Sequence, residues 1–512
     1  MQNKRWLVWI TLAGLCVRFG VWFYFRAHTM PLVTTRLPDD ALYYFTIASN
    51  LAHGHGVSFD GNHPTNGMHP LWLLLITPIF TLSLTKWGLI HSVLVFQSVL
   101  DTAIIWLIGS TIYDVLPNAK ESNRKTAAIL GALIYALSTI SILRSINGLE
   151  TTITALLFVV WFRVYIRIKH ESLKEWMMLG IATGFLLLAR TDSFIVLLPL
   201  ALYLLVTRGK SEWKGILQAS ILAIAIIAPW FIWNLKNFGT IVQSSAEAVP
   251  MLAMRKYEVL YGSGKYWHFF VEAIRNMLKP FWYSAFGLPL LTMGYAVIVR
   301  RKNVSPAERS IYLLIAGGVL LLFVHSFFRG FIRDWYIEEL LPLFLIGFCI
   351  SLCANAGVTE VRASGRYALA TLVVFLQFVL FRQPQYTSQS QVLTLGLPTT
   401  EKLTALSNVA SFNSGYYGYF ATRPGSVVNM DGVVNSDVLT ALKKGRIAEY
   451  LDRDSVAYIL DFQGDFGGYI NLFDHHLLDA FERDTSFGNP SEGNDALALY
   501  RRKAILGQKQ IP

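Results

Sequence analysis

The sequence has few charged residues and almost no cysteine. Charged side chains make up 15% of the 512 residues, hydrophobic ones 54%, and the mean hydropathy is +0.43. Soluble domains carry about a quarter charged residues, so this composition excludes an ordinary soluble protein and indicates several membrane helices. The three cysteines, Cys16, Cys349 and Cys353, all lie in apolar runs and show neither a disulfide framework nor a metal-ligand spacing.

The sequence also lacks internal repeats and low-complexity tracts. Its net charge is +11, which in a soluble protein would suggest a nucleic-acid partner. In a membrane protein the same excess is typical of cytoplasmic loops, so we predict a lipid bilayer and no nucleic acid as surroundings. Residues 6–25 follow a short basic start and are too long for the apolar part of a signal peptide, so we predict that they form the first membrane helix.

Eleven apolar runs are long enough to be predicted membrane spans. They cover residues 6–25, 88–112, 127–146, 151–168, 176–190, 193–207, 215–234, 281–299, 310–328, 337–354 and 366–381. Residues 71–85 are also apolar, but the run is short and contains Pro78. We therefore predict that this run lies at the outer membrane interface and does not cross.

Basic loops set the predicted orientation. Lys and Arg gather near the N-terminus and in the loops 120–125, 163–174, 208–214, 300–302 and 362–366. These loops all lie on one side only if residues 71–85 do not cross, and the excess of positive charge makes that side cytoplasmic. The resulting protein lies in a bacterial inner membrane, with a cytoplasmic N-terminus and an extracytoplasmic C-terminal domain.

The composition divides the chain into two predicted domains. Residues 1–384 form the helical membrane domain, with residues 26–87 as its first outer loop. Residues 385–512 contain no long apolar run and form a small extracytoplasmic α/β domain. Within it we predict strands at 426–430 and 455–460 and helices at 437–442 and 446–453.

Residues 38–70 form the most polar stretch of the N-terminal half. They contain three Asp, four His, four Gly and three Pro between two apolar segments. An acidic pair, Asp39 and Asp40, precedes a predicted amphipathic helix at 41–52 that would lie in the membrane interface. Either carboxylate has two interpretations, because an Asp at the start of a helix can cap it or can carry chemistry.

Motifs at both ends of the chain resemble one family. Asp39 and Asp40 followed by Tyr43, and then His69 before Pro70, are similar to the outer loop of superfamily C glycosyltransferases. The stretch FNSGYYGYFATRPGSVVNMDGVVN, residues 412–435, resembles a C-terminal pattern of their bacterial branch. That branch is related to the protein O-mannosyltransferases and to the aminoarabinose and arabinofuranose transferases, which take sugars from polyprenyl-phosphate carriers.

The resemblance implies an enzyme and its site. The activity would be inverting transfer of a monosaccharide from a polyprenyl-phosphate carrier to a glycan, lipid or protein acceptor on the outer face. Asp39 would be the general base. The implied catalytic residues are Asp39, Asp40 and Glu150, and the implied substrate-binding residues are Tyr43, His69, Arg144, Lys265, Arg329, Arg333 and Tyr336.

Several of these residues have a structural alternative. Glu150 precedes a helix and is equally suited to cap it or to pair with Arg144. Arg190 and Asp192 are predicted to form a mutual ion pair at a helix junction, and Asp101 is predicted to be a protonated or hydrogen-bonded residue of a membrane span. The four His match no metal-ligand spacing, so we predict no cofactor and leave a divalent cation open. Arg329 and Arg333 are also suited to anchoring at the interface.

Two other classes of function remain open from the residues alone. A transporter or flippase for a lipid-linked anion would also span the membrane many times, although repeated halves are typical of that class. A non-catalytic scaffold whose outer domain binds a partner is the second alternative. A scaffold, however, does not require an acidic pair and basic residues on the same face.

The orientation leads to a direct prediction. A periplasmic reporter enzyme fused after Gln385 should be active, and a reporter that works only in the cytoplasm should be silent at the same position. Fusion sites in the basic loops, such as Lys120, should give the opposite pattern. Cytoplasmic activity after Gln385 would overturn the predicted count of 11 helices.

Overall fold

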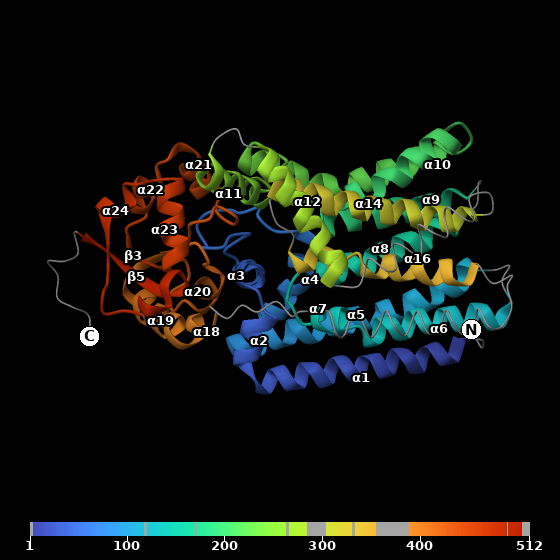
Figure 1. The fold of residues 1–512 in the computed structure, drawn as a ribbon, viewed down its shortest axis with the longest axis horizontal. Helices are drawn as coiled ribbons and strands as arrows, with labels where there is room; N and C mark the ends of the chain where they lie inside the picture. Colours follow the sequence, from blue (N-terminus) through green and yellow to red (C-terminus); the bar gives the residue numbers. More distant parts are fainter. Residues whose placement is uncertain are drawn as a thin grey trace. The chain divides into compact units, whose positions relative to one another are not determined.

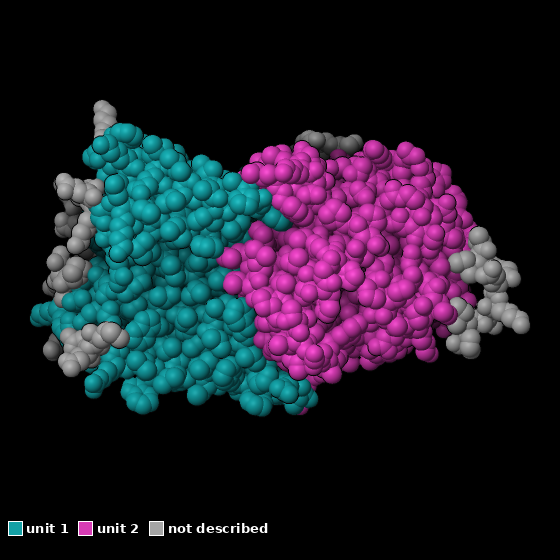
Figure 2. Space-filling view, turned by 180° about the vertical axis from the view of Figure 1, so that it is seen from behind, with its two compact units in different colours: residues 1–27, 94–230, 269–384 teal, residues 28–93, 231–268, 385–512 magenta. Residues whose placement is uncertain are grey.

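The computed structural model describes residues 4–116, 120–168, 172–262, 266–283, 304–329, 333–354, 389–488 and 490–503. The chain forms two compact units, which are coloured separately in Figure 2. Unit 1 comprises residues 1–27, 94–230 and 269–384, and unit 2 comprises residues 28–93, 231–268 and 385–512. Unit 2 therefore contains most of the first outer loop together with the C-terminal residues.

Unit 1 is built from helices. They are α1 (Arg5–Ala27), most of α5 (Lys86–Val115), α6 (Glu121–Leu137), α7 (Thr139–Arg144), α8 (Thr151–Tyr165), α9 (Leu173–Ala189), most of α10 (Ser193–Phe238), most of α12 (Tyr266–Tyr283), α14 (Pro306–Arg329), α15 (Asp334–Glu338) and α16 (Leu341–Ala354). The long helices α1, α6 and α16 lie side by side in Figure 1, in agreement with their contacts. The outward residues of α1 include Trp9, Leu12 and Phe23, as expected of a helix that faces lipid.

Four helical segments among the described residues are long and apolar enough to cross a membrane. They are Arg5–Ala27, Lys86–Val115, Ser211–Phe238 and Pro306–Phe328. Shorter apolar helices include Thr151–Tyr165, Ser193–Arg208 and Leu341–Ser351. The protein is thus an integral membrane protein. Most of the predicted span 281–299 and all of 366–381 lie outside the described residues.

The run 71–85, which is predicted not to cross the membrane, forms two short helices. Residues 71–85 correspond to α4 (Pro70–Ile76) and the 3-10 helix η2 (Thr77–Thr81). Twelve helical residues extend over roughly 20 Å, less than the thickness of the hydrocarbon core. The break follows from Pro78, which lacks a backbone N–H to continue the α-helix.

Small residues let α9 approach the second half of α10. A Cβ atom on Gly180 would lie 2.5 Å from the carbonyl oxygen of Ala219, and one on Gly184 would lie 2.6 Å from Ile226. The contacts advance together along both helices, so the segment that begins at Ser211 runs in the same direction as α9. Glycine is required at such positions because any side chain would push the two backbones apart.

The C-terminal part of unit 2 is a five-stranded mixed sheet. Its strands are β1 (Asn408–Ser411), β2 (Val427–Asn429), β3 (Val456–Phe462), β4 (Phe481–Arg483) and β5 (Leu497–Arg502), in the order β2-β1-β3-β5-β4. The strands β2, β1 and β3 are parallel, and β5 pairs antiparallel with both β3 and β4. Every residue of β3 is buried, which is typical of a central strand covered on both faces.

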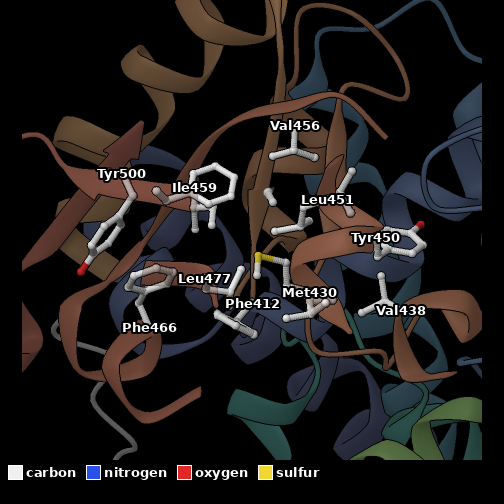
Figure 3. Packing of buried hydrophobic residues seen from close by; sticks show 14 of the residues in the cluster. Phe412, Met430, Val438, Tyr450, Leu451, Val456, Ile459, Phe466, Leu477 and Tyr500 are labelled. Atoms are coloured by element: carbon white, nitrogen blue, oxygen red, sulfur yellow. The ribbon is translucent and has the colours of Figure 1, made fainter. Parts of the chain in front are cut away.

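Helices connect and cover this sheet. They are α18 (Gln389–Gln391), η3 (Val392–Gly396), α19 (Leu397–Leu406), α20 (Gly415–Phe420), α21 (Ser436–Lys444), α22 (Ile447–Arg453), α23 (Gln463–Leu472), α24 (Leu477–Ala480) and η4 (Pro490–Asp495). One apolar core joins sheet and helices, with Met430, Leu451 and Ile459 fully buried (Figure 3). In the same core the rings of Phe466 and Tyr500 are tilted against each other, with centroids 3.8 Å apart. The predicted strands and helices of this domain are confirmed within a few residues at each end.

The remaining helices of unit 2 come from earlier in the chain. They are α2 (Thr29–Thr35), α3 (Asp39–Ala52), α4, η2 and α11 (Ser244–Tyr261). The predicted helix at 41–52 corresponds to α3, but the prediction that it is amphipathic, with one buried face, is wrong. Residues on both faces of α3 are buried, because it packs against α20 as well as α4 and η2. This packing brings the first outer loop against the C-terminal sheet domain.

The cap of α21 provides a test of this fold. The side chain of Asn435 accepts a hydrogen bond from the N–H of Val438 (3.1 Å) and donates one to the hydroxyl of Tyr450 (3.1 Å). Replacing Asn435 with Ala should cost about 1 kcal/mol or more, because the cap and the buried hydroxyl both lose a partner. The midpoint temperature of thermal unfolding of the purified protein should fall by a few degrees for Asn435→Ala and remain unchanged for Ser436→Ala. Equal midpoints for the two variants would contradict the assigned cap.

Candidate active site

The predicted site residues fall into two groups, one in each unit. Asp39, Asp40, Tyr43 and His69 belong to unit 2. Arg144, Glu150, Arg333 and Tyr336 belong to unit 1. Lys265 and the side chain of Arg329 lie outside the described part of the structure. The roles assigned to all these residues stay predictions.

In unit 2 the carboxylate of Asp39 receives two backbone N–H groups from α20. One oxygen accepts a hydrogen bond from Gly415 (2.9 Å) and the other from Tyr416 (3.0 Å). Both donors are first-turn residues of α20, whose N–H groups have no partner within the helix. Asp39 therefore caps a helix, but one that lies 376 residues away along the chain.

Its own helix uses Asp39 differently. Pro38 precedes α3 in an extended conformation, and no side chain caps that end. Asp39 and Asp40 occupy the first turn of α3, where negative charge is favoured by the helix dipole. Asp39 is half-buried and Asp40 is exposed, so the two neighbouring acids have different surroundings.

The surroundings of Asp39 make its carboxyl group a suitable proton acceptor near neutral pH. Burial raises the pKa of Asp39 to about 6, although the amides of Gly415 and Tyr416 act in the opposite direction. The negative charge of Asp40 adds to the increase in the pKa. A carboxylate with a pKa close to the working pH is an effective general base, because it is ionised and still binds a proton.

Tyr43 connects α3 to the ends of two strands. Its hydroxyl lies 3.2 Å from the carbonyl oxygen of Phe412, 3.2 Å from a carboxylate oxygen of Asp431 and 3.3 Å from the amide of Asn429. Its ring packs edge-on against Phe59 at 5.5 Å. Burial, and next the charge of Asp431, raises the pKa of Tyr43, so its hydroxyl remains a proton donor. Tyr43 therefore contributes to the docking of α3.

Asp431 is a second unusual acid in unit 2. Burial raises its pKa to about 7, against the opposing effect of the Val433 N–H, which lies 2.7 Å from the carboxylate. The charges of Asp40 and Asp39 contribute to the same increase. Asp431 belongs to the C-terminal pattern of the sequence, yet its chemistry was not predicted. The available signal was the position of this Asp directly after the predicted strand 426–430, because an acid next to a buried segment is unusual.

The histidines of the outer loop have separate roles in the structure. The backbone N–H of His69 donates to the hydroxyl of Tyr44 (3.0 Å), and His69 precedes Pro70 at the start of α4. His63 pairs with Asp60 at 2.8 Å within a tight loop. Among the residues with an assigned placement, no three His, Cys, Asp or Glu side chains are arranged as metal ligands.

In unit 1 Arg190 is the centre of an acidic cluster. Its guanidinium lies 3.1 Å from Glu150, 2.7 Å from Asp192 and 3.3 Å from Glu339. The predicted ion pair of Arg190 with Asp192 is confirmed. Glu150 pairs with Arg190 and not with Arg144. Glu339 was missed because its position within the predicted span 337–354 gives no sign of a distant partner.

Two aromatic rings extend this cluster. His325 lies 2.9 Å from Asp192, and its ring stacks on that of Tyr336 with centroids 4.5 Å apart. The guanidinium of Arg190 lies 5.0 Å from the same Tyr336 ring. The predicted substrate residue Tyr336 thus lies at the acidic cluster, whereas Arg333 is exposed and rests on Trp335.

Arg144 belongs to another buried network in unit 1. Asp101 lies 2.6 Å from Arg144 and 2.6 Å from Arg18, and all three side chains have no exposed surface. The hydroxyl of Tyr135 donates to Asp101 at 2.8 Å, and Arg144 also contacts Tyr135 and the carbonyl of Glu338. Asp101 therefore pairs with two arginines from other helices, and the sequence of its own apolar span gives no sign of them.

Comparison with known proteins identifies the class of fold. ArnT from Cupriavidus metallidurans in the apo state is 12% identical, covers all of both chains and gives a TM-score of 0.59. Its complex with undecaprenyl phosphate gives 0.58 at 10% identity, covering 99% of this chain and 100% of that one. The Archaeoglobus fulgidus oligosaccharyltransferase AglB, in complex with an inhibitory peptide and a dolichol-phosphate, gives 0.57 at 11% identity and covers 92% and 71%.

The chain has the fold of the superfamily C membrane glycosyltransferases. Within it, residues 68–233 match the dolichyl-phosphate-mannose-protein mannosyltransferase family. No curated protein sequence matches the chain. The predicted fold, a polytopic helical membrane protein with a small C-terminal α/β part, is confirmed.

The buried network of Asp101 leads to a prediction about stability. Replacing Asp101 with Asn should cost about 3–5 kcal/mol, because two fully buried arginines lose their counter-charge. The same change at Asp114 is a matched control on the same helix, since Asp114 also meets cations, namely Lys4 (2.7 Å), Arg163 (2.8 Å) and Arg167 (3.6 Å). Its side chain is 29% exposed, so Asp114→Asn should cost about 1 kcal/mol or less.

The yield of folded protein and its thermal midpoint in detergent measure the difference. Asp101→Asn should be poorly recovered, and Asp114→Asn should resemble the unaltered protein. Equal behaviour of the two variants would show that the buried network does not hold unit 1 together.

Proposed function

We propose that this protein is an inverting glycosyltransferase that moves a monosaccharide from a polyprenyl-phosphate carrier to an acceptor hydroxyl on the extracytoplasmic face of a bacterial inner membrane. Asp39 is the general base. The observation that carries the proposal is the carboxylate of Asp39, held by two amides and with a pKa of about 6. The shared fold with ArnT, which was solved with undecaprenyl phosphate, supports the class of donor.

The proposed reaction needs one base and a good leaving group. As the acceptor oxygen attacks the anomeric carbon, its proton passes to Asp39. The bond between the anomeric carbon and the carrier phosphate breaks, and the polyprenyl phosphate leaves with the electron pair. Attack on the face opposite the phosphate inverts the anomeric configuration. A phosphate is already a stable anion, so the site has to stabilise charge there and not to supply a proton.

The surroundings of Asp39 fit the role of a base. Both of its oxygens accept an N–H, which orients the carboxylate and leaves a further lone pair on each oxygen for the acceptor hydroxyl. The side chain is only half-buried, so an acceptor can reach it. Asp40, whose side chain is exposed, is the weaker candidate.

The carrier phosphate requires cations. Arg329 and Arg333 lie at one end of α14 and at the start of α15, and Arg333 is exposed. Together with Lys265 they are our proposed contacts of the phosphate, since arginine forms paired hydrogen bonds with phosphate oxygens. Glu150 and Tyr336 are proposed to position the acceptor or the sugar from the cluster around Arg190.

Replacing Asp39 tests the proposal. Asp39→Asn keeps the size of the side chain and an acceptor oxygen but removes the carboxylate, so transfer should fall by ~10²-fold or more. Binding of the carrier should survive. Asp40→Asn is the matched control, and it should retain most of the activity. Radiolabelled sugar transfer from a defined polyprenyl-phosphate donor measures both, and full activity of a folded Asp39→Asn variant would remove Asp39 from its role.

The pH dependence of transfer is a second test. The pKa of Asp39, about 6, means that the base is protonated and inactive below that pH and ionised above it. The rate should therefore rise through pH 6 and level off, with roughly a tenth of the maximum left at pH 5. A rate that is independent of pH between 5 and 7 would exclude Asp39 as a base with this pKa.

A further inference from the structure

The C-terminal sheet has its switch point at β1. The chain passes from β1 to β2 on one side and then crosses to β3 on the other side, with all three strands parallel. In open sheets of this kind, ligands bind beyond the carboxyl ends of the strands at this point, beside the turn from the strand into the next helix. Here that turn is residues 412–414, between β1 and α20.

A carboxylate from the first outer loop occupies this position. The two amides that open α20 donate to Asp39, and the turn itself is held by Asp461 of β3, which accepts from the N–H of Phe412 and from the hydroxyl of Ser411 (3.0 Å). Asp461 is 1% exposed. The turn is thus fixed from the sheet side, and α20 presents its amides to Asp39 in a defined position.

We propose that the β1–α20 turn of the C-terminal domain is a positioning element of the active site, with Gly415 and Tyr416 as the residues whose amides orient the carboxylate of Asp39 and stabilise its negative charge. This inference rests on the proposed function of Asp39 as a base. It assigns to the C-terminal domain a direct part in catalysis through its backbone. The C-terminal domain would then be required for turnover even when every side chain of the predicted membrane domain, residues 1–384, is unchanged.

Close packing supports the assignment. A Cβ atom on Gly415 would lie 2.2 Å from the carbonyl oxygen of Asp39 and 2.9 Å from its carboxylate, so only glycine allows the helix to approach this far. One turn later, a Cβ atom on Gly418 would lie 2.3 Å from the ring of Phe59. The two glycines therefore lie on the face of α20 that packs against the first outer loop.

A tyrosine fixes the same helix to the segment before Asp39. The hydroxyl of Tyr416 donates to the carbonyl of Leu37 at 2.9 Å, two residues before the base. The next residue, Tyr417, is equally buried, but its hydroxyl has no hydrogen-bond partner among the described residues. The two adjacent tyrosines thus form a matched pair, in which only Tyr416 is hydrogen-bonded to the segment that precedes Asp39.

The test compares pH profiles of sugar transfer in the full-length protein. Gly415→Ala should lower kcat by ~10-fold and move the acidic limb of the profile upward by about one pH unit, because the carboxylate loses donors that favour its charged form. The KM for the polyprenyl-phosphate donor should stay unchanged. Gly468→Ala is the control, since a Cβ atom there meets nothing within 4 Å.

The tyrosine pair keeps the test decisive if Gly415→Ala does not fold. Tyr416→Phe should move the acidic limb in the same direction by a smaller amount, and Tyr417→Phe should leave it in place. A shift in neither Gly415→Ala nor Tyr416→Phe, with Asp39→Asn inactive, would overturn the positioning role and leave the proposed base intact. Full activity of Asp39→Asn would instead overturn the proposed function.

Discussion

The hydrogen bonds between one carboxylate and two backbone amides organise unit 2. A half-buried Asp39 would be costly to ionise without donors, and the first turn of a helix has N–H groups that need acceptors. Each requirement is met by the other, at 2.9 and 3.0 Å. The contact joins residues that are 376 positions apart, and therefore holds the outer loop and the C-terminal sheet together as one unit.

The surrounding contacts strengthen this junction with further hydrogen bonds to backbone carbonyls. Tyr43 reaches the ends of β1 and β2, and Tyr419 donates to the carbonyl of Lys86 at 3.0 Å. The amine of Lys86 in turn donates to the carbonyl of Ala421 at 2.9 Å. Aromatic side chains with a polar end suit such a surface, because the ring is buried and the hydroxyl still finds a partner. The glycines of α20 make the short distances possible.

Unit 1 follows the same principle at different residues. Its buried charges occur as networks, with Asp101 between Arg18 and Arg144 and with Arg190 among three carboxylates. A lone charge in a membrane protein is costly, so each ion needs partners from other helices. These partners fix the relative rotation of the helices. They also explain why Arg18, Arg144 and Arg190 are buried in ion pairs.

Apolar length and charge patterning in the sequence determined the fold class, the outer polar loop and the main elements of the C-terminal domain, because these depend on local composition. Motif spacing also singled out Asp39 and Tyr43. Only the tertiary structure revealed that Asp39 meets Gly415 and Tyr416, since a backbone N–H is present at every residue but proline and leaves no mark in the sequence. The partner of Glu150 likewise followed from how helices pack, because a buried charge is satisfied by whichever side chain the fold brings within reach.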